Sequence, residues 1–358
     1  MSKLLSLIIP TYNMEALLPR CLDSLLVDSA LQRLEAIVVN DGSKDGSLAV
    51  ANRYKERFPD TVTVIDKPNG NYGSTINAAL PEAQGKYVKV LDSDDWFNSD
   101  ALVNFLDALE KIDADFIVTH FTIIHPGGKK EFAKYNLYGK EPYEYGKVYD
   151  LGYVLGDGYI RFFMMHSITY RTDLLRKNGY IQTEGISYSD TEWDTYPMFY
   201  AKDVVFLNLN LYQYNMDREG QTMDPKVFNR SIAQQEKITS QILAFLEKNG
   251  LDNLDSGRQL FLRQYYLNRL RLICKCHLFD IDRKDFNPEH FTELESQYQE
   301  VCKRFNLGEI KLYPENKIIR CNAMKYWHKH HKRWPAWFEA FNRSVNSIMK
   351  TIYMLLFR

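Results

Sequence analysis

Cysteine is scarce in this chain, and its spacing excludes the usual cysteine-based architectures. The 358 residues contain five cysteines, an odd number that fits no disulfide framework. The sequence has no C-x-x-C pair, so a structural zinc site is not expected. This cysteine usage is typical of a reducing compartment, and a cytoplasmic location is expected.

Long apolar runs and an excess of charge are also absent. No stretch of 18 apolar residues occurs, so no transmembrane helix is expected. The formal net charge is −1, which gives no global footprint of a nucleic-acid-binding protein. The first expected strand follows the N-terminus almost at once, so no signal peptide is expected either. The length allows one large domain and a smaller one of a soluble, globular enzyme.

Four apolar segments, residues 6–9, 34–39, 62–65 and 87–91, each run straight into polar residues. Helical patterns alternate with these segments, which predicts an α/β fold with a mostly parallel sheet flanked by helices and right-handed crossovers. In open sheets of this type, ligands bind outside the carboxyl ends of the strands. The polar segments expected to converge there are 11–13, 40–43, 69–73 and 92–95.

The fourth segment ends in three carboxylates, Asp92, Asp94 and Asp95. The period-2 geometry of a strand predicts that Asp92 and Asp94 lie on the same side. Mg²⁺ and Mn²⁺ are often held by one or two carboxylates together with substrate phosphates, so this pair can share a divalent cation and a ribose. An isolated D-x-D is more often a solvated acidic turn, and only the neighbouring segments favour the functional interpretation.

The order of these segments resembles an inverting family 2 glycosyltransferase of the GT-A fold, of the bacterial surface-polysaccharide type. The resemblance lies in P-T-Y-N at 10–13, N-D-G-S-x-D-G-S at 40–47, N-G-x-x-G at 69–73 and L-D-S-D-D-W at 91–96. It covers about the first 220 residues. Residues 1–223 are expected to form the nucleotide-sugar-binding catalytic domain.

The resemblance implies a set of nucleotide contacts and a metal ligand. Asp94 is implied as the principal ligand of Mg²⁺ or Mn²⁺ on the diphosphate, with Asp92 beside it on the ribose. The other implied nucleotide contacts are Pro10, Thr11, Tyr12, Asn13, Asp41, Asn71, Tyr72, Gly73 and Ser93. The family often has Arg where this chain has Ile76, which leaves the base open; a UDP-linked donor is favoured from the resemblance alone.

The resemblance also implies a catalytic base, Asp190. A positioned carboxylate that takes the proton of an acceptor hydroxyl contributes on the order of 10²–10⁴ in rate. Asp190 is expected near a helix N-terminus, where the helix dipole favours its ionised form. The alternative is a capping carboxylate without chemistry. Glu192 and Asp194 are further candidates for the base.

Two other residues have less specific surroundings. His166 precedes a short expected strand and either points at the acceptor or lies in the core. Arg218 lies in a polar loop that in similar enzymes closes over the diphosphate, so it either clamps phosphate oxygens or is a solvated surface residue.

Residues 224–358 are predicted to be a helical region, with coarse segments 227–248, 256–279, 289–305 and 323–357. From residue 320 onward the chain has eight Lys or Arg and one Glu, interleaved with aromatic residues. A basic helix with a Trp/Phe/Leu face is typical of an interfacial membrane anchor. The alternative is that this face packs on the catalytic domain or on a second copy in a homo-oligomer.

The sequence therefore predicts metal-dependent, inverting transfer of a hexosyl or N-acetylhexosaminyl group to a hydroxyl of a glycan or lipid-linked acceptor. Transfer is expected at the cytoplasmic face of the membrane. A sugar-nucleotide nucleotidyltransferase is the second hypothesis, but the chain lacks the Gly-rich, Arg-containing loop such enzymes carry after the first strand. A non-catalytic assembly protein is the third, and the intact carboxylates argue against it.

Overall fold

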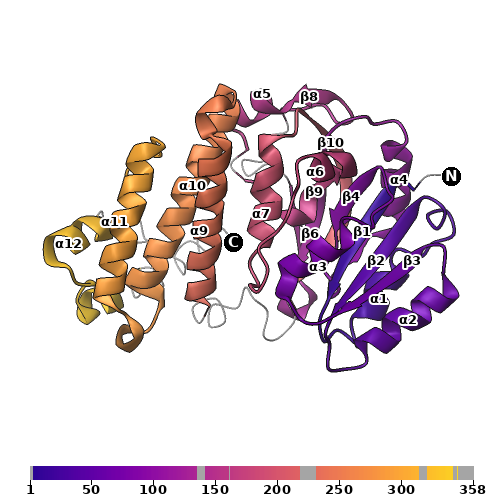
Figure 1. The fold of residues 1–358 in the computed structure, drawn as a ribbon, viewed down its shortest axis with the longest axis horizontal. Coiled ribbons are helices and arrows are strands. Elements are labelled where there is room, and N and C mark those ends of the chain that lie inside the picture. The colour runs from indigo at the N-terminus through magenta and orange to yellow at the C-terminus, as the bar shows by residue number, and fades with distance from the viewer. Residues whose placement is uncertain are drawn as a thin grey trace. The chain divides into compact units, whose positions relative to one another are not determined.

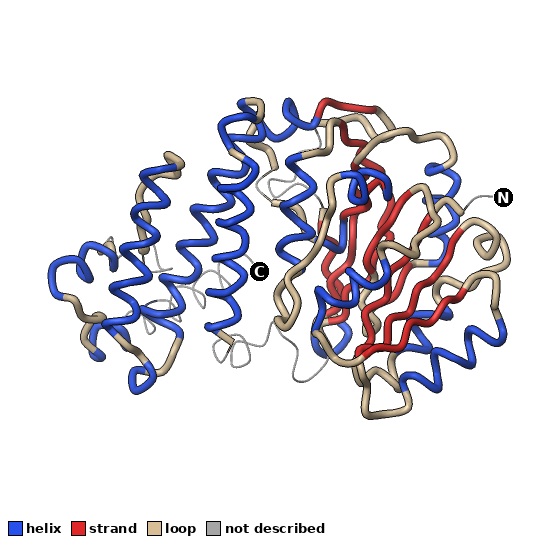
Figure 2. The backbone as a smooth tube through the Cα atoms, viewed as in Figure 1, coloured by secondary structure: helices blue, strands red, loops and turns tan. Residues whose placement is uncertain are grey.

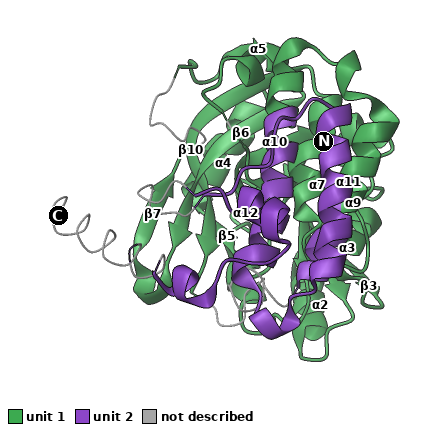
Figure 3. Ribbon diagram, turned by 90° about the vertical axis from the view of Figure 1, so that its left-hand side faces the viewer, with its two compact units in different colours: residues 1–222, 240–262 green, residues 223–239, 263–358 purple. Residues whose placement is uncertain are grey.

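The computed structural model describes residues 3–134, 142–160, 162–217, 231–313, 321–341 and 345 (Figures 1 and 2). Arg218 and residues 342–344 and 346–358 of the basic C-terminal segment lie outside these residues, so the structure does not address the expectations for them. The described residues divide into two compact units, which Figure 3 colours separately. Unit 1 comprises Met1–Thr222 and Ser240–Leu262, and unit 2 comprises Met223–Thr239 and Arg263–Arg358. A functional boundary at residue 223 stays a prediction.

The strands of the described residues form one ten-stranded sheet in unit 1, flanked by helices, as predicted. The order is β3-β2-β1-β4-β9-β6-β10-β5, with β7 paired to β6 and β8 paired to β10. The strands are β1 (Leu5–Thr11), β2 (Leu34–Asp41), β3 (Val62–Lys67), β4 (Tyr87–Val90), β5 (Trp96–Phe97), β6 (Phe116–Ile124), β7 (Lys130–Ala133), β8 (Val148–Asp150), β9 (Ile168–Arg171) and β10 (Asp203–Asn215).

The sheet is parallel where the motif-bearing strands lie and mixed beyond them. β1 pairs in parallel with β2 and with β4, and β2 pairs in parallel with β3. β9 runs antiparallel to β4 and β6, whereas β6 and β10 are parallel. The carboxyl ends of β1 to β4 therefore meet at one edge, where the sequence places its polar segments.

Buried strands and one-sided helices explain why these segments fold as they do. Every residue of β2 is buried, which is typical of a strand covered on both faces. Helix α4 buries Leu102, Phe105, Leu106 and Leu109, which recur at the helical period and join the core formed with β1, β2 and β4. The helices of unit 1 before residue 200 are α1 (Leu18–Asp23), α2 (Ser47–Arg57), α3 (Asn71–Ala79), α4 (Ser99–Leu109), α5 (Leu151–Gly156), α6 (Thr172–Lys177) and α7 (Asp190–Thr195).

The C-terminal part of the chain is helical, as the sequence predicts, but its last segment is interrupted. The helices are α9 (Ile232–Asn249), α10 (Ser256–Lys275), α11 (Pro288–Arg304) and α12 (Ala323–His330). The expectation of helix through residues 323–357 is wrong between α12 and residue 336. His331 closes α12 in the left-handed conformation with φ 49°, and Pro335 precedes a new helical stretch at residues 336–341.

Two tryptophans that the sequence interleaves with the basic residues are core of unit 2. The Trp327 ring packs 4.8 Å from that of Phe291, and the Trp334 ring lies 5.2 Å from that of Phe279. Both are buried, whereas Trp337 and Phe341, which belong to the predicted apolar face, are 71% and 53% exposed. Whether that face binds a membrane or a protein stays a prediction. Within the described residues no helix has the length and apolarity to cross a bilayer.

Candidate active site

The carboxyl ends of the parallel strands open into a cavity of about 530 Å³ in unit 1. Most residues that the sequence singled out line it together. The lining residues are Pro10, Thr11, Tyr12, Met14, Asp41, Asn69, Asn71, Tyr72, Thr75, Asp92, Ser93, Asp94, Met165, Ser187, Asp190 and Tyr214. They come from segments up to about 200 residues apart, and the sheet topology brings them to one edge.

Asp92 and Asp94 both line the cavity, although strand geometry does not place them there. β4 ends at Val90, and the backbone N–H of Asp95 donates to the carbonyl of Asp92 at 3.0 Å, which closes a turn. Two side chains, Arg20 and Asn215, donate to the Asp94 carbonyl at 3.0 and 3.3 Å. The two carboxylates are therefore positioned by a turn that is fastened to other elements.

Asp95, the third carboxylate of the segment, is a buried structural group. Its two oxygens accept from the Tyr212 hydroxyl at 2.6 Å and from the Asn215 backbone N–H at 2.7 Å. Burial raises the pKa of Asp95 well above its ordinary value, and the charges of Asp94 and Asp92 raise it further. Asp95 therefore joins the turn to β10.

Tyr72 connects the third motif to the fourth. Its hydroxyl donates to Asp92 Oδ1 at 3.1 Å. Burial, followed by the charges of Asp92 and Asp190, raises the pKa of Tyr72 well above its ordinary value, so the phenol stays a donor. The charges of Asp92, Asp94 and Asp190 also raise the pKa of Tyr214, although burial is the larger cause. Asp190 is therefore close enough to both tyrosines to share an electrostatic environment with the D-x-D turn.

Asp41 is buried at the end of β2 and paired with Lys67 of β3. Lys67 Nζ lies 2.7 Å from Asp41 Oδ1, which also accepts from the Gly70 backbone N–H at 2.9 Å. The Asn69 amide donates to the Asp41 carbonyl at 2.9 Å. These bonds hold the third motif against the second. Sequence reasoning did not single out Lys67.

Two predicted nucleotide contacts do not line the cavity. Asn13 has φ 55°, and its Oδ1 accepts from the Lys44 backbone N–H at 2.7 Å, which joins the first motif to the second. Gly73 is buried; a Cβ there would lie 2.3 Å from the Thr183 carbonyl oxygen. Both residues stabilise the loops that form the cavity, but neither lines the cavity itself.

Asp190 lines the cavity as the first residue of α7. The N-cap position belongs to Ser189, whose Oγ donates to Gln182 Oε1 at 3.2 Å and makes no capping bond. The capping alternative for Asp190 is therefore wrong in its simple form. A catalytic role stays a prediction.

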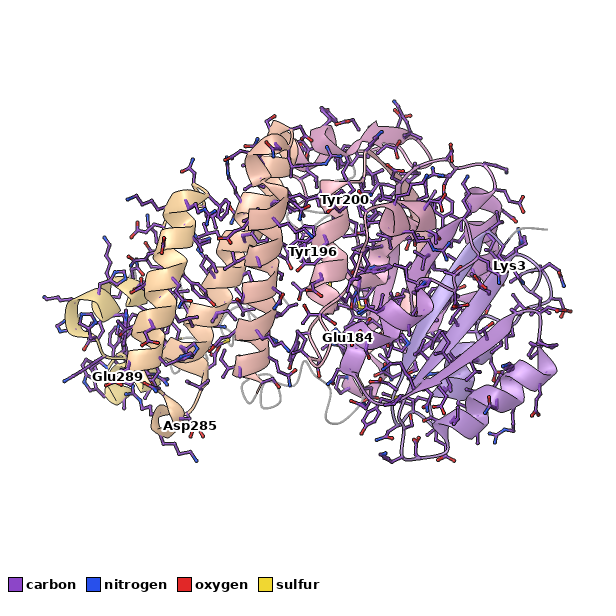
Figure 4. All side chains as sticks on the ribbon, in the orientation of Figure 1. Lys3, Glu184, Tyr196, Tyr200, Asp285 and Glu289 are labelled. Carbon is purple, nitrogen blue, oxygen red and sulfur yellow. The ribbon has the colours of Figure 1, made fainter. Side chains whose placement is uncertain are left out.

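Glu192, a further candidate for the base, is buried and accepts several hydrogen bonds. Its carboxylate accepts from the Thr183 backbone N–H at 2.6 Å, the Thr183 hydroxyl at 2.7 Å and the Tyr196 hydroxyl at 3.0 Å. Figure 4 labels Tyr196 among the described side chains. Burial raises the pKa of Glu192. Burial and the charge of Asp190 raise the pKa of Asp194 well above its ordinary value. Neither carboxylate lines the cavity, so the geometry favours Asp190.

Part of the chain matches a known protein family. Residues 6–179, just under half of the chain, match the family described as "Glycosyl transferase family 2". The matched segment runs from β1 to the residues just after α6, so it contains all four motifs.

Two relatives each match about a third of this chain. An uncharacterised glycosyltransferase of Mycoplasma pneumoniae, the MG025 homolog, is 34% identical over 134 residues, which cover 37% of this chain and 44% of that protein. A poly(ribitol-phosphate) beta-glucosyltransferase of Bacillus spizizenii is 35% identical over 113 residues, which cover 31% of this chain and 18% of that protein. The chain thus spans less than half the length of either relative.

The fold of this chain also has a solved counterpart. The crystal structure of residues 1–349 of S. aureus TarS matches with a TM-score of 0.59 at 19% identity, covering 97% of this chain and 91% of that one. At this identity the likeness establishes the GT-A fold alone.

Oxygen and nitrogen donors for a divalent cation lie near the turn formed by Asp92–Asp95. Ligand atoms of Asp92, Asp95 and His166 all lie within 4.8 Å of one another. His166 is buried 4.1 Å, centroid to centroid, from the Tyr214 ring, and burial, then Lys89, lowers its pKa to about 3. The imidazole is therefore neutral and in the core, one of the two positions the sequence left open. Mg²⁺ and Mn²⁺ prefer oxygen ligands, which favours the cavity-lining Asp92 and Asp94 as the carboxylate pair.

Five lining residues were not singled out from the sequence. They are Met14, Thr75, Met165, Ser187 and Tyr214. Ser187 belongs to the segment that leads to Asp190, so its position before a helix could have identified it. Met165 and Tyr214 lie in apolar surroundings, whose pattern indicates core as readily as a site.

Proposed function

We propose that this glycosyltransferase transfers a sugar from a nucleotide-sugar to a hydroxyl of a glycan or lipid-linked acceptor, with divalent-metal dependence and inversion at the anomeric carbon. One observation carries the proposal. Asp92 and Asp94 on one turn and Asp190 on α7 line the same cavity of about 530 Å³, a volume within the range of small-molecule sites.

The donor set supports a hard divalent cation. The cavity presents the carboxylates of Asp92 and Asp94, which suit Mg²⁺ or Mn²⁺ together with diphosphate oxygens. When bound, such an ion neutralises charge that develops on the departing diphosphate. Asp92 Oδ1 already accepts a hydrogen bond from the Tyr72 hydroxyl, so this proposal takes Asp94 as the principal metal ligand.

The two ends of the cavity would perform different tasks. The Asp41 side chain accepts from Lys67, Gly70 and Ser74 through Oδ1, and its Oδ2 would accept from the imide N–H of uracil. Asp190 would take the proton of the acceptor hydroxyl as that oxygen attacks the anomeric carbon from the face opposite the diphosphate. In-line attack of this kind inverts the anomeric configuration. The donor is proposed to be a UDP-hexose or UDP-N-acetylhexosamine.

A donor screen tests the proposal. The full chain is incubated with UDP-, GDP-, TDP- and CMP-linked sugars, with Mn²⁺, with Mg²⁺ or with excess EDTA, and release of free nucleotide is measured. We expect metal-dependent release of UDP from one UDP-sugar, because Asp41 and the D-x-D turn fit that donor. The absence of release from every donor, in the presence of metal, would contradict a transferase function.

We also propose that unit 2 binds the cytoplasmic face of an anionic membrane through Trp337 and Phe341. These aromatic side chains are exposed, and exposed Lys329 and Lys332 lie nearby in the sequence. Basic residues contribute about 1 kcal/mol each to binding at an anionic membrane surface, and buried aromatic area adds to this. A lipid-linked acceptor would then lie close to the enzyme.

Substitution of Trp337 and Phe341 by serine is expected to weaken binding to anionic vesicles by at least about tenfold, because two exposed aromatics leave the interface. Sedimentation with vesicles at low and high salt measures the effect. The matched control is Tyr313→Ser, another exposed aromatic of unit 2 outside the basic segment. Unchanged vesicle binding, or a change of oligomeric state in solution, would assign this face to a protein partner instead.

A further inference from the structure

Unit 2 contains a cluster of two histidines around one carboxylate, remote in sequence from every motif described above. His277 Nε2 lies 2.6 Å from Glu236 Oε1, and His290 Nε2 lies 2.9 Å from Glu236 Oε2. The two imidazole centroids are 5.6 Å apart. The ligand atoms of all three residues lie within 4.8 Å of one another.

Three separate elements hold the cluster. Glu236 projects from α9. His277 lies in the π-helical turn Cys276–Asp280 that follows α10, and such turns insert one residue and re-aim the side chains around it. His290 is fixed in the first turn of α11, where the Asn287 side chain caps its backbone N–H at 3.1 Å. The side chains therefore converge although 54 residues separate the first from the last.

The environment of the cluster suits a cation. His277 is buried with its ring 5.3 Å from that of Phe291, whereas the His290 side chain is 46% exposed and gives access from solvent. Burial acts to raise the pKa of Glu236, but the hydrogen bond and charge of His277, together with His290, outweigh it and lower that pKa. Glu236 is therefore ionised, and both imidazoles turn the same ring nitrogen toward it.

We propose that Glu236, His277 and His290 bind a divalent transition metal of the zinc type. One carboxylate oxygen and two imidazole nitrogens form a three-ligand set that leaves a fourth position for water or a ligand. Tetrahedral zinc with bonds of about 2.0–2.2 Å needs ligand atoms about 3.3 Å apart. The present separations of 2.6 and 2.9 Å require a widening of less than one ångström, and the half-exposed His290 can move that far.

The second ring nitrogen of His277 is expected to limit the affinity of the site for a metal. His277 Nδ1 is buried and has no hydrogen-bond partner among the residues that the structure describes. When a metal occupies Nε2, the ring proton resides on Nδ1, and there it has no acceptor in that part of the chain. Zinc sites usually satisfy this N–H, so binding is expected to be weaker than at such sites.

A metal here would join α9, the π-helical turn and α11, and it would stabilise unit 2 independently of sugar transfer. The single pair of His328 and Glu295 provides a comparison within the same unit. His328 Nε2 lies 2.8 Å from Glu295 Oε1, and the His328 side chain is 43% exposed, much like His290. A second histidine is what distinguishes the Glu236 cluster in the described residues.

The test uses the full chain after removal of metal with EDTA and dialysis. Zn²⁺ is titrated calorimetrically in the presence of excess Mg²⁺, which occupies the hard D-x-D carboxylates, and Co²⁺ is added separately to record its visible absorption. We expect one equivalent of Zn²⁺ to bind, an intense tetrahedral Co²⁺ spectrum, and a rise in the unfolding temperature with Zn²⁺. His290→Asn should weaken Zn²⁺ binding at least about 100-fold, because it removes a direct ligand.

Two variants separate this site from the alternatives. His328→Asn, the matched control, and Asp94→Asn should both leave Zn²⁺ affinity unchanged. His290→Asn is preferred to a substitution of buried His277, since a half-exposed side chain at a helix start can be replaced without unfolding the unit. Equal Zn²⁺ affinity of His290→Asn and the parent chain, or the lack of a stoichiometric site in the parent, would overturn the proposal.

Discussion

Replacing Asp94 with asparagine is expected to lower kcat for sugar transfer by at least about 10²-fold, because the leaving diphosphate would lose its principal metal ligand. The fold should survive the change. Arg20 and Asn215 hold the Asp94 backbone carbonyl, and asparagine keeps the shape of the side chain. The measurements are transfer rate at saturating donor and the free energy of unfolding in urea.

Removal of the metal should lower the transfer rate for the same reason, because Asp94 would have no metal to hold. EDTA is expected to inactivate the parent chain, and Mn²⁺ or Mg²⁺ should restore it, whereas Asp94→Asn should respond little to added metal. The matched control is Asp100→Asn, an exposed aspartate in the first turn of α4 outside the cavity, which should keep parental activity. Full activity of the parent chain in excess EDTA would refute the metal-dependent mechanism.

The sequence predicted the edge of the sheet at which the site forms. Apolar runs that end in polar residues locate the carboxyl ends of parallel strands, and the cavity lies there. Asp92 and Asp94 line the cavity, but strand alternation, the reason the sequence suggested for their shared side, is wrong. Strand alternation does not apply beyond Val90, and the turn that does position them depends on Arg20 and Asn215, which are distant in the chain.

The sequence could not show which of several similar carboxylates are structural and which line the candidate site. Asp95 and Glu192 resemble their neighbours in sequence, but hydrogen bonds from Tyr212 and Thr183 commit both to the structure. Those partners come from other elements, so no local pattern identifies them. Trp327 and Trp337 illustrate the same limit, since both lie in one basic, aromatic segment and only tertiary packing buries the first.

Replacing Asp190 with asparagine is expected to lower kcat by at least about 10²-fold, because the acceptor hydroxyl would lose its base. Donor affinity should survive, since Asp190 is proposed to face the acceptor. Stability should also survive: asparagine keeps the shape of the side chain, and the N-cap position of α7 belongs to Ser189. The measurements are acceptor-dependent transfer, calorimetric donor affinity and urea unfolding.

Glu192→Gln is the matched comparison, two positions along the same helix. Glutamine has only one accepting oxygen, so its NH₂ group would face either the Thr183 backbone N–H or the Tyr196 hydroxyl, and one of these hydrogen bonds would be lost. The substitution should therefore lower the free energy of unfolding by about 1–3 kcal/mol. The two variants therefore separate chemistry from folding: Asp190→Asn should change the rate and spare stability, and Glu192→Gln should lower the free energy of unfolding.

Asp194→Asn distinguishes the remaining carboxylate. Burial and the charge of Asp190 raise the pKa of Asp194 well above its ordinary value, and Asp194 does not line the cavity. Asparagine at this position keeps the shape of a side chain outside the cavity and should leave kcat within about threefold of the parent. If Asp190→Asn instead keeps more than about a tenth of parental kcat while Asp194→Asn loses activity, the base is Asp194 and not Asp190.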